Sequence, residues 1–242
     1  MDLTERDIRQ RELLPPKRLA SLHVTVIGVG AIGRQLSLQL AAIGVGKLHL
    51  VDFDDVGVEN LAVQGFLEDD IDKRKVDAVG DLCRLTNSQI EIVKEYGRFN
   101  RSTPVGDIVF SCVDTMRVRS FIFEQTKERT KLFIDGRMLG EVMRILSVRC
   151  EVPEDVEYYE TKTLDADGDI IPGRCTNRST LYCSNMAAAW MVLRFTQWLR
   201  DQPLKRDISL GLQIGQVLDV EADLAAAEAE EAEAETEERS AT

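Results

Sequence analysis

The chain has 242 residues, of which 44% are hydrophobic and 30% charged, as in globular proteins that bury a sizeable core. Its net charge is −12, but residues 221–242 hold nine acidic residues and one arginine, a balance of −8 that leaves −4 for the remainder. This charge favours neither nucleic-acid binding nor a membrane surface, and no apolar stretch reaches the roughly 20 residues of a membrane span. We expect a cytoplasmic protein, because the first 14 residues are too charged for a signal peptide and the five cysteines are widely spaced.

Strand and helix patterns alternate through the first 138 residues. A β-branched run at 23–27 leads into glycines and predicts a buried strand, and residues 31–44 then show helical spacing and end at a glycine. The later predicted elements are a strand at 47–55, a helix at 75–86, strands at 90–96 and 107–114, a helix at 118–130 and a strand at 131–138. This alternation predicts an α/β fold with a doubly wound, mainly parallel, Rossmann-like sheet.

The pattern changes after Met138 and predicts an antiparallel C-terminal extension of the sheet. Residues 1–220 are assigned to one domain, and the Ala/Glu-rich segment 221–242 to an acidic disordered tail, since it lacks an apolar face. The predicted elements of this part are an antiparallel strand at 141–152, a polar mobile loop at 153–174, a largely apolar helix at 185–201 and a closing strand at 207–220.

A glycine motif stands between the first predicted strand and helix. Gly28, Gly30 and Gly33 form GxGxxG, which allows a tight turn and lets backbone N–H groups approach a phosphate at the helix N-terminus. Asp52 closes the second strand, where a carboxylate can accept hydrogen bonds from both ribose hydroxyls. Alone, these residues are compatible with NAD, FAD or ATP, or with a close-packed turn that binds nothing.

The segments that follow narrow the choice. The block "DFDDVGVENLAVQ" at 52–64, "KRKV" at 73–76 and "CVDTMRVR" at 112–119 together resemble the ThiF/MoeB/HesA family, adenylyltransferases related to ubiquitin-activating enzymes. The resemblance extends from Arg6 to about Val220. It implies an enzyme that uses ATP and Mg²⁺ to adenylate the C-terminal glycine of a ubiquitin-like protein. Many enzymes of this type are homodimers, so the resemblance also implies a second copy.

The resemblance implies a role for each motif residue, with the three glycines around the phosphates. The other implied contacts are Arg9 of "RDIRQ" with the γ-phosphate, Asp52 with the ribose, Asn60 and Gln64 with the phosphate site, Lys75 with the phosphates and Asp114 with Mg²⁺. Lys73 is an alternative to Lys75, and Arg9 acts either within its own subunit or across a dimer. Arg137 and Arg144 lie on the segment expected to hold the partner's tail and are placed to meet a carboxylate or backbone carbonyls.

The chain departs from the family pattern at one position. Where the family has the arginine of "NLxRQ", this sequence has Val63, so one phosphate-neutralising charge is missing. Arg34, in the first turn of the glycine-motif helix, is a hypothetical substitute. If nothing substitutes, the chain is a weakened or inactive relative.

Cys175 is the candidate acceptor of an activated acyl group. It stands between Arg174 and Arg178 in a polar loop before the last long helix, and neighbouring cations lower a thiol's pKa toward neutrality. In the family, a cysteine in such a loop forms the thioester. Cys183 is a competing candidate that we expect to pack inward, and the remaining cysteines are expected in the core: Cys83, Cys112 and Cys150.

The leading hypothesis is therefore a short, bacterial-type activating enzyme that adenylates a ubiquitin-like protein, forms a thioester on Cys175 and passes it to a conjugating-enzyme partner. Activation of a sulfur carrier for thiamine or molybdopterin synthesis is second, although zinc cysteines of the sulfur-transfer type are missing. A non-catalytic adaptor is supported by Val63. An NAD-dependent oxidoreductase explains the glycines and Asp52 but leaves Lys75 and Cys175 without a role.

Overall fold

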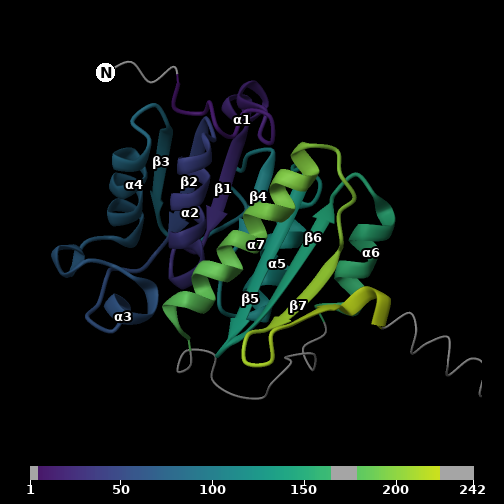
Figure 1. Ribbon diagram of the computed structural model, residues 1–242. Coiled ribbons are helices and arrows are strands. Elements are labelled where there is room, and N and C mark those ends of the chain that lie inside the picture. The colour runs from purple at the N-terminus through teal and green to yellow at the C-terminus, as the bar shows by residue number, and fades with distance from the viewer. Residues whose placement is uncertain (1–4, 165–178, 224–242) are drawn as a thin grey trace, which may run out of the picture.

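The computed structural model describes residues 5–164 and 179–223. These residues form an eight-stranded sheet in the order β3-β2-β1-β4-β5-β6-β7-β8 (Figure 1). The first five strands in this order are parallel, and β6, β7 and β8 continue the sheet antiparallel. The predicted mainly parallel sheet with an antiparallel extension is confirmed. The strands are β1 (His23–Ile27), β2 (Lys47–Asp52), β3 (Glu91–Tyr96), β4 (Ile108–Ser111), β5 (Leu132–Leu139), β6 (Val142–Arg149), β7 (Asp207–Gly211) and β8 (Gln216–Asp219).

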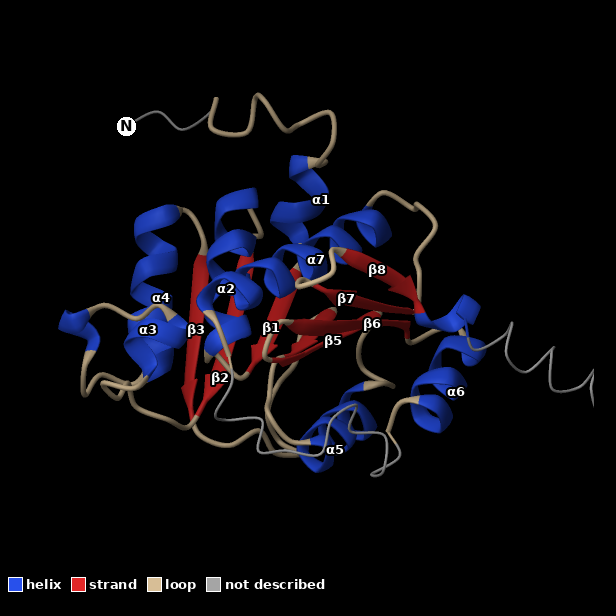
Figure 2. Ribbon diagram, turned by 60° about the horizontal axis from the view of Figure 1, so that its bottom comes forward, coloured by secondary structure: helices blue, strands red, loops and turns tan. Residues whose placement is uncertain are grey.

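Helices cover both faces of this sheet. Figure 2 shows α2, α4 and α7 on one face and α5 and α6 on the other. The larger core lies under α2 and α7, and a smaller one, built around Phe123, Phe133 and Tyr159, lies under α5 and α6. The helices are α1 (Pro16–Ser21), α2 (Ala31–Ile43), α3 (Asn60–Gln64), α4 (Lys75–Thr86), α5 (Met116–Thr126), α6 (Pro153–Lys162) and α7 (Leu181–Leu199), with a 3₁₀ turn at Glu68–Asp70.

Two predicted helices have the expected ends for clear local reasons. Helix α2 stops at Gly44, whose φ of 101° is left-handed and whose N–H returns to the carbonyls of the last turn. Helix α4 coincides with the predicted range 75–86. The short helices α1 and α3 were not predicted, because six and five residues are too few to show a 3.6-residue period.

The prediction of a mobile loop at 153–174 was wrong for residues 153–162. Residues Pro153–Lys162 form α6, which opens on a proline with Glu154 and Asp155 in its first turn. Only Asp155 and Tyr159 of this helix are buried, so its polar composition hid the helical period. Residues 165–174 lie outside the described part of the chain.

Three smaller expectations near the C-terminus also change. The predicted single strand at 207–220 is the hairpin β7–β8, which turns through Gly215 with a φ of 64°. Helix α7 begins at Leu181, earlier than predicted, because the Thr180 side chain caps it by accepting from the Cys183 N–H. The first residues of the predicted disordered tail are ordered, since residues 220–223 are helical and Glu221 pairs with Arg206. Residues 224–242 lie outside the described part.

The N-terminal segment packs at the end of the molecule opposite to the glycine turn. Arg6 donates to the carbonyl of Ala41 at 2.9 Å and Gln10 to that of Ile43 at 2.9 Å, both at the C-terminal end of α2. Arg18 of α1 pairs with Asp201, just beyond α7. Across residues 5–164 and 179–223, no helix has both the length and the apolar character needed to cross a membrane.

We predict that Gly33→Ala destabilises the fold, because an added Cβ would stand 1.8 Å from the carbonyl oxygen of Gly28. Overpacking of this kind costs about 1–3 kcal/mol or more of the free energy of unfolding, which urea denaturation measures. The matched control is Gly97→Ala, whose Cβ meets nothing within 4 Å and which should stay within about 0.5 kcal/mol of wild type. Equal stability of the two variants would contradict the tight packing of the turn.

Candidate active site

The candidate site lies where the strand order reverses, between β1 and β4. Parallel sheets of this kind bind ligands at such a switch point, beyond the carboxyl ends of the strands. The segments that follow β1 and β4 touch here, because the Cys112 N–H donates to the Ile27 carbonyl at 2.9 Å. A Cβ on Gly28 would lie 2.8 Å from the Cys112 carbonyl oxygen. The glycine turn after β1 therefore packs directly against the connection that leads to Asp114.

The glycine turn presents free hydrogen-bond donors. Gly30 is the N-cap of α2 and has no side chain to cap the first-turn N–H groups, which therefore remain available to an anion. Gln64 lies over this turn, with its Oε1 3.4 Å from the position of a Gly30 Cβ. That oxygen is buried without a hydrogen-bond partner among the described residues. An unpaired amide beside uncapped N–H groups fits a polar ligand at the turn.

Asp52 ties the turn to β2. Its Oδ2 accepts from the Val29 N–H at 2.7 Å, and its Oδ1 accepts from the Asp54 N–H at 2.8 Å. Burial raises the pKa of Asp52 above its ordinary value, although both backbone donors and the charge of Lys75 oppose the rise. Each carboxylate oxygen has a second lone pair. The side chain therefore holds the turn in place and retains capacity for two further donors, as a ribose would supply.

The structure separates the two candidate lysines. Lys75 is buried, and its Nζ lies 3.0 Å from Asp54 in the loop that follows β2. Lys73 is half-exposed and pairs with Asp70 at 3.1 Å. Asn60 accepts the Gly57 N–H through Oδ1 at 2.9 Å, which leaves its amide N–H groups as donors. Of the two lysines, the geometry favours Lys75 as the one beside the site.

Asp114 is an exposed carboxylate at the carboxyl end of β4, and a buried charge network holds the connection that carries it. Arg119 donates to the carbonyl of Val113, to that of Gly136 at 3.0 Å, and to the Asp135 carboxylate. Within residues 5–164 and 179–223, no cluster of three or more His, Cys, Asp or Glu side chains is placed to hold a metal. A lone carboxylate suits Mg²⁺ that is otherwise held by phosphates and waters.

Asp135 is the centre of that network. It is fully buried on β5 and also accepts from Arg137 Nε at 2.8 Å and from the Tyr159 hydroxyl at 3.0 Å. Burial alone would raise the pKa of Asp135, but the Arg119 and Arg137 guanidiniums outweigh burial and hold it below its ordinary value. Arg137 also donates to the Thr163 carbonyl at 2.9 Å. The network thus links the Asp114 connection to the end of α6.

The arginines expected to receive a partner's tail have partners within the chain instead. Arg137 is held by Asp135 and Thr163, and the buried Arg144 pairs with Asp207 on β7, with Nε 2.8 Å from Oδ1. The pairing of β6 with β7 brings Asp207 within reach of Arg144. Both arginines therefore have partners within the chain, and their contact with a partner's tail stays a prediction.

Arg9 does not lie at the glycine turn of its own chain. Its side chain is exposed and has no hydrogen-bond or ion-pair partner in the described residues, and the segment around it is anchored at the C-terminal end of α2. Helix α2 has 13 residues and is therefore about 20 Å long, with the glycine turn at its other end.

Arg34 reaches the segment that carries Val63. Its guanidinium is buried, lies 5.2 Å from the centre of the Phe66 ring, and places Nη1 3.3 Å from the position of a Gly65 Cβ. Burial lowers the pKa of Arg34, and the charge of Asp70 opposes this. The side chain is a cation near α3, with no ion pair to another described residue.

Cys175 lies outside the described residues, and the four described cysteines are poor nucleophiles. Burial raises the pKa of Cys183 to about 11 and that of Cys83 to about 12. It also raises the pKa of Cys112 and of Cys150, which are half-buried. A thiol with a raised pKa is not a thiolate at neutral pH. Cys183, the competing candidate, packs inward as expected.

A comparison with protein families now bears on this site. A sequence model of the ThiF family matches residues 6–228. The chain belongs to the ThiF family. The match spans the glycine turn, both candidate lysines, Asp114 and Cys175.

Several proteins of known name resemble this ThiF-family chain. It is 32% identical over 130 residues to the maize "Adenylyltransferase and sulfurtransferase MOCS3-1", a match that covers 51% of this chain and 28% of that protein. It is 29% identical over 130 residues to the Drosophila simulans "Ubiquitin-like modifier-activating enzyme 5", covering 47% and 32%. The matches thus span about a third or less of those proteins. Escherichia coli MccB has the same fold, with a TM-score of 0.71 at 18% identity over 90% of this chain and 71% of that one.

Sequence reasoning missed two parts of the site in this ThiF-family chain. Asp54, the partner of Lys75, stood in the quoted "DFD" block without an assigned role. The Asp135 network was also missed, although an acidic residue directly after the apolar "LFI" run of a strand is a signal for a buried charge that needs partners.

We predict that Asp135→Asn lowers the free energy of unfolding by about 3–5 kcal/mol at neutral pH, because it leaves the buried Arg119 and the partly buried Arg137 without their counter-charge. The pKa of Asp135 is below its unfolded value, so its contribution is present above about pH 4 and is lost as the pH falls further. Urea denaturation at several pH values should therefore show wild type and variant converging in acid.

The matched control is Asp81→Asn, which removes an exposed carboxylate paired with Lys94 and should change stability by less than about 1 kcal/mol. A cost for Asp135→Asn no larger than that of the control, or one that does not shrink in acid, would show that the network does not stabilise the fold as an ion cluster.

Proposed function

We propose that this chain is an ATP-dependent adenylyltransferase that activates the C-terminal glycine of a ubiquitin-like protein, forms a thioester on Cys175 and passes the acyl group to a conjugating-enzyme partner. The observation that carries the proposal is the uncapped glycine turn at the switch point, flanked by the buried Asp52 and Lys75. Family membership and the names of the relatives support adenylation. A sulfur-carrier substrate is the second candidate, because the maize relative is named a sulfurtransferase as well.

The residues at the turn fit a nucleoside triphosphate. Gly28 and Gly33 allow the close backbone packing that positions the turn, and the uncapped α2 N–H groups beyond Gly30 would donate to phosphate oxygens. A ribose would meet Asp52. Escherichia coli MccB, which shares the fold, has been solved with ATP. Mg²⁺ at Asp114 would supply neutralising charge between phosphate oxygens.

Adenylation is a phosphorus displacement in which the chain supplies positioning and positive charge. A carboxylate oxygen of the terminal glycine forms a bond to the α-phosphorus, the bond from that phosphorus to the bridging oxygen breaks, and pyrophosphate leaves with the negative charge. Lys75 would neutralise phosphate charge by exchanging its ion pair with Asp54 for one with the ligand. Asn60 and Gln64 donate from their amides beside it.

The missing charge at Val63 needs a substitute. Arg34 contacts the α3 region from beneath and has no ion pair to a described residue, which supports its proposed role. Loss of exchange in Arg34→Ala, measured as described below for Lys75, tests it. Arg9, at the far end of α2, would serve the site only from a second copy of the chain.

The second half-reaction needs a thiolate. The sulfur of Cys175 would attack the acyl carbon, the carbon–oxygen bond to the phosphate would break, and AMP would leave, which yields a thioester. No described cysteine is suited to this step, since burial raises the pKa of each. The arginines at 174 and 178 would lower the pKa of Cys175.

We predict that Lys75→Ala reduces ATP–pyrophosphate exchange, measured with a glycine-ended ubiquitin-like protein, by roughly 100- to 1,000-fold, because a buried cation is lost from the phosphate site. The matched control is Lys73→Ala, two positions earlier and half-exposed, which should retain exchange. Equal loss in both variants would remove Lys75 from its proposed role. No exchange by wild type under any condition would favour the non-catalytic adaptor.

We predict that Cys175→Ala retains pyrophosphate exchange but no longer forms a reducible covalent adduct with the ubiquitin-like protein on a non-reducing gel, because only the acceptor sulfur is removed. Cys183→Ala is the matched control and should keep the adduct, since Cys183 is buried with a pKa of about 11. An adduct that persists in Cys175→Ala contradicts the assignment. Exchange without an adduct in wild type would favour the sulfur-carrier alternative.

A further inference from the structure

Three exposed arginines at the carboxyl ends of the parallel strands have no carboxylate partner among the described residues. Arg74 precedes α4, Arg98 follows β3, and Arg117 lies in the first turn of α5. Other exposed basic side chains, such as Lys131 and Lys205, pair with a carboxylate. We call the three arginines the arginine rim. Their charge is not used within the described fold and is available to an anion.

Two arginines of the rim are stacked on exposed aromatic rings. The Arg98 guanidinium lies 3.9 Å from the centre of the Phe53 ring. The Arg74 guanidinium lies 4.5 Å from the centre of the Tyr96 ring, and both rings are 44% exposed. Stacking covers one face of a guanidinium and leaves the N–H groups in its plane free to donate. The rim therefore presents oriented donors that suit carboxylates or phosphates.

The Arg98 side of the rim borders the candidate nucleotide site. Phe53, on which Arg98 stacks, directly follows Asp52. The Gly97 N–H, next to Arg98 in the chain, donates to the Asp52 carbonyl at 3.0 Å. An anion held by Arg98 would therefore lie beside the carboxylate proposed to bind the ribose.

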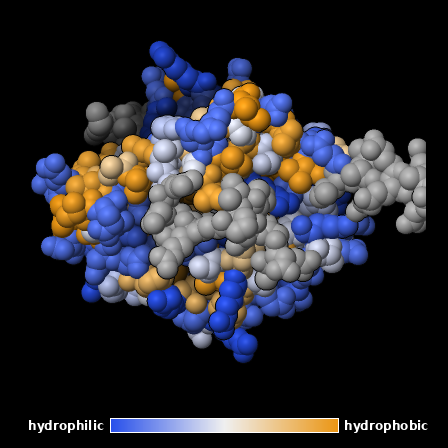
Figure 3. Space-filling view, turned by 90° about the horizontal axis from the view of Figure 1, so that it is seen from below, coloured by the Kyte–Doolittle hydropathy of each residue, from blue (hydrophilic) through white to orange (hydrophobic). Residues whose placement is uncertain are grey.

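Arg117 extends the rim to the other side of the site. It lies three positions after Asp114 and one helical turn before Phe121 on α5, so Arg117 and Phe121 share a face of this helix. The Phe121 ring contacts that of Phe99 in the segment after β3, with ring centres 6.1 Å apart. Figure 3 shows hydrophilic side chains along the lower margin of this end of the molecule, the side on which Figure 2 places α5.

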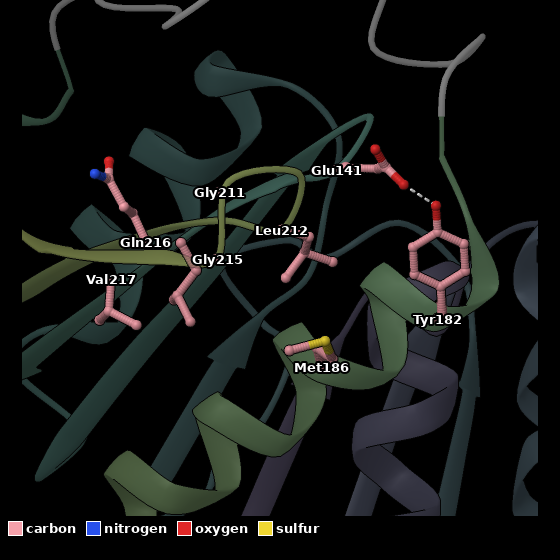
Figure 4. A pocket seen from close by; sticks show the side chains of 9 residues that line it. Glu141, Tyr182, Met186, Gly211, Leu212, Gly215, Gln216 and Val217 are labelled. Carbon is pink, nitrogen blue, oxygen red and sulfur yellow. Dashed lines mark hydrogen bonds between the residues drawn. The ribbon is translucent and has the colours of Figure 1, made fainter.

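The groove between α7 and the β7–β8 hairpin has a different chemistry. It has a volume of about 420 Å³, and Met186 and Leu212 project into it (Figure 4). The one charged side chain that lines it within the described residues is Glu141, which accepts a hydrogen bond from the Tyr182 hydroxyl. An acidic ligand would meet a carboxylate and apolar surface there, whereas the rim offers it guanidiniums.

We propose that the acidic C-terminal segment 224–242 docks on the arginine rim and competes there with the triphosphate, where the competition rests on the proposed function. The segment carries seven glutamates and one arginine, so its charge is complementary to that of the rim. The seven residues are Glu228, Glu230, Glu231, Glu233, Glu235, Glu237 and Glu238. A docked segment would place carboxylates where phosphate oxygens approach, which makes it an autoinhibitory contact.

The segment begins on the face of the sheet that carries α5. Glu221 pairs with Arg206, whose guanidinium lies 5.1 Å from the centre of the Tyr158 ring on α6. Helices α5 and α6 cover the same face (Figure 2). The 19 residues after 223 can span about 60 Å when extended, whereas the five strand spacings from β6 to β3 amount to about 24 Å. The rim is therefore within reach, and the tether gives the segment a high effective concentration there.

Nucleic acid is the other class of anion that binds arginines beside exposed aromatic rings. The net charge of −12 opposes this alternative, because the chain as a whole repels a polyanion. The acidic segment is part of the same chain and needs no encounter through solution. These observations favour the segment as the occupant, and nucleic acid is kept as an outcome of the test.

The closing experiment replaces the seven glutamates by glutamine in the full chain, which removes the charge of the segment and keeps its length. A fluorescently labelled peptide with the sequence of residues 224–242 should bind this glutamine variant without ATP, as measured by fluorescence anisotropy. The affinity should fall as salt rises, because the ion pairs are exposed and screened. Wild type should bind the peptide at least about fivefold more weakly, since its own segment occupies the rim.

The arginines of the rim are tested in the same glutamine background. Replacing all three by alanine (Arg74→Ala, Arg98→Ala and Arg117→Ala) should abolish peptide binding. The matched control is Arg129→Ala, an exposed arginine beyond the other end of α5, which should retain it. Peptide binding that survives the triple substitution, or that is absent from the glutamine variant, overturns the docking. So does rim-dependent binding of a single-stranded oligonucleotide in place of the peptide, which would assign the rim to nucleic acid.

The competition is measured by calorimetric titration with Mg·ATP. The glutamine variant should bind ATP about three- to tenfold more tightly than wild type at low salt, and added peptide should restore the weaker affinity. Both differences should shrink at high salt. Equal ATP affinity of wild type and glutamine variant overturns the competition. If neither binds ATP, the proposed function fails together with the competition, whereas the peptide measurement still decides whether the segment docks.

Discussion

The close backbone contact between the first and fourth strand connections is the constraint on which the site depends. Gly33 lies against the carbonyl of Gly28, and Gly28 lies against that of Cys112, so α2 begins as near to β1 and β4 as atoms allow. A side chain at these positions would move the helix N-terminus away from the switch point. This contact positions the first N–H groups of α2. The geometry of the glycine turn is therefore set by backbone packing and not by a functional side chain.

Buried carboxylates fix both the glycine turn and the segment that leads to Asp114. Asp52 accepts from the turn itself, and Asp135, through Arg119, holds the carbonyl that precedes Asp114. Both carboxylates are buried, so each hydrogen bond acts in a low-dielectric interior where loss of a partner is costly. Their pKa values move in opposite directions, because Asp52 has mainly backbone donors whereas Asp135 faces two guanidiniums. Asp52 is the more open to a ligand, since no arginine occupies its oxygens.

The sequence was sufficient for the parallel half of the sheet and for the family, whereas the roles of the individual site residues stay predictions. Strands such as β1 are short apolar runs bounded by glycine or aspartate, and α4 has a clean helical period. Helix α6 was missed because it buries only two side chains, and the hairpin because its turn contains apolar residues such as Ile214. Lys75, already the first candidate in the sequence, differs from the alternative Lys73 in burial, which pattern reasoning does not show because the two lysines stand two positions apart at the start of one helix. The partner of Arg144 was beyond pattern reasoning, because Asp207 is brought to it by the pairing of β6 with β7. The contact of Arg137 with Thr163 was equally so, because it depends on where α6 ends.

Two features reduce the positive charge near the glycine turn: Arg9 lies away from the turn in its own chain, and position 63 is a valine. A triphosphate carries several negative charges, and within one copy the described cations beside the turn are Lys75, already paired with Asp54, and the buried Arg34. Lys75 is already neutralised by a carboxylate of its own chain, so Arg34 is the one of these two described cations whose charge remains available to the phosphates.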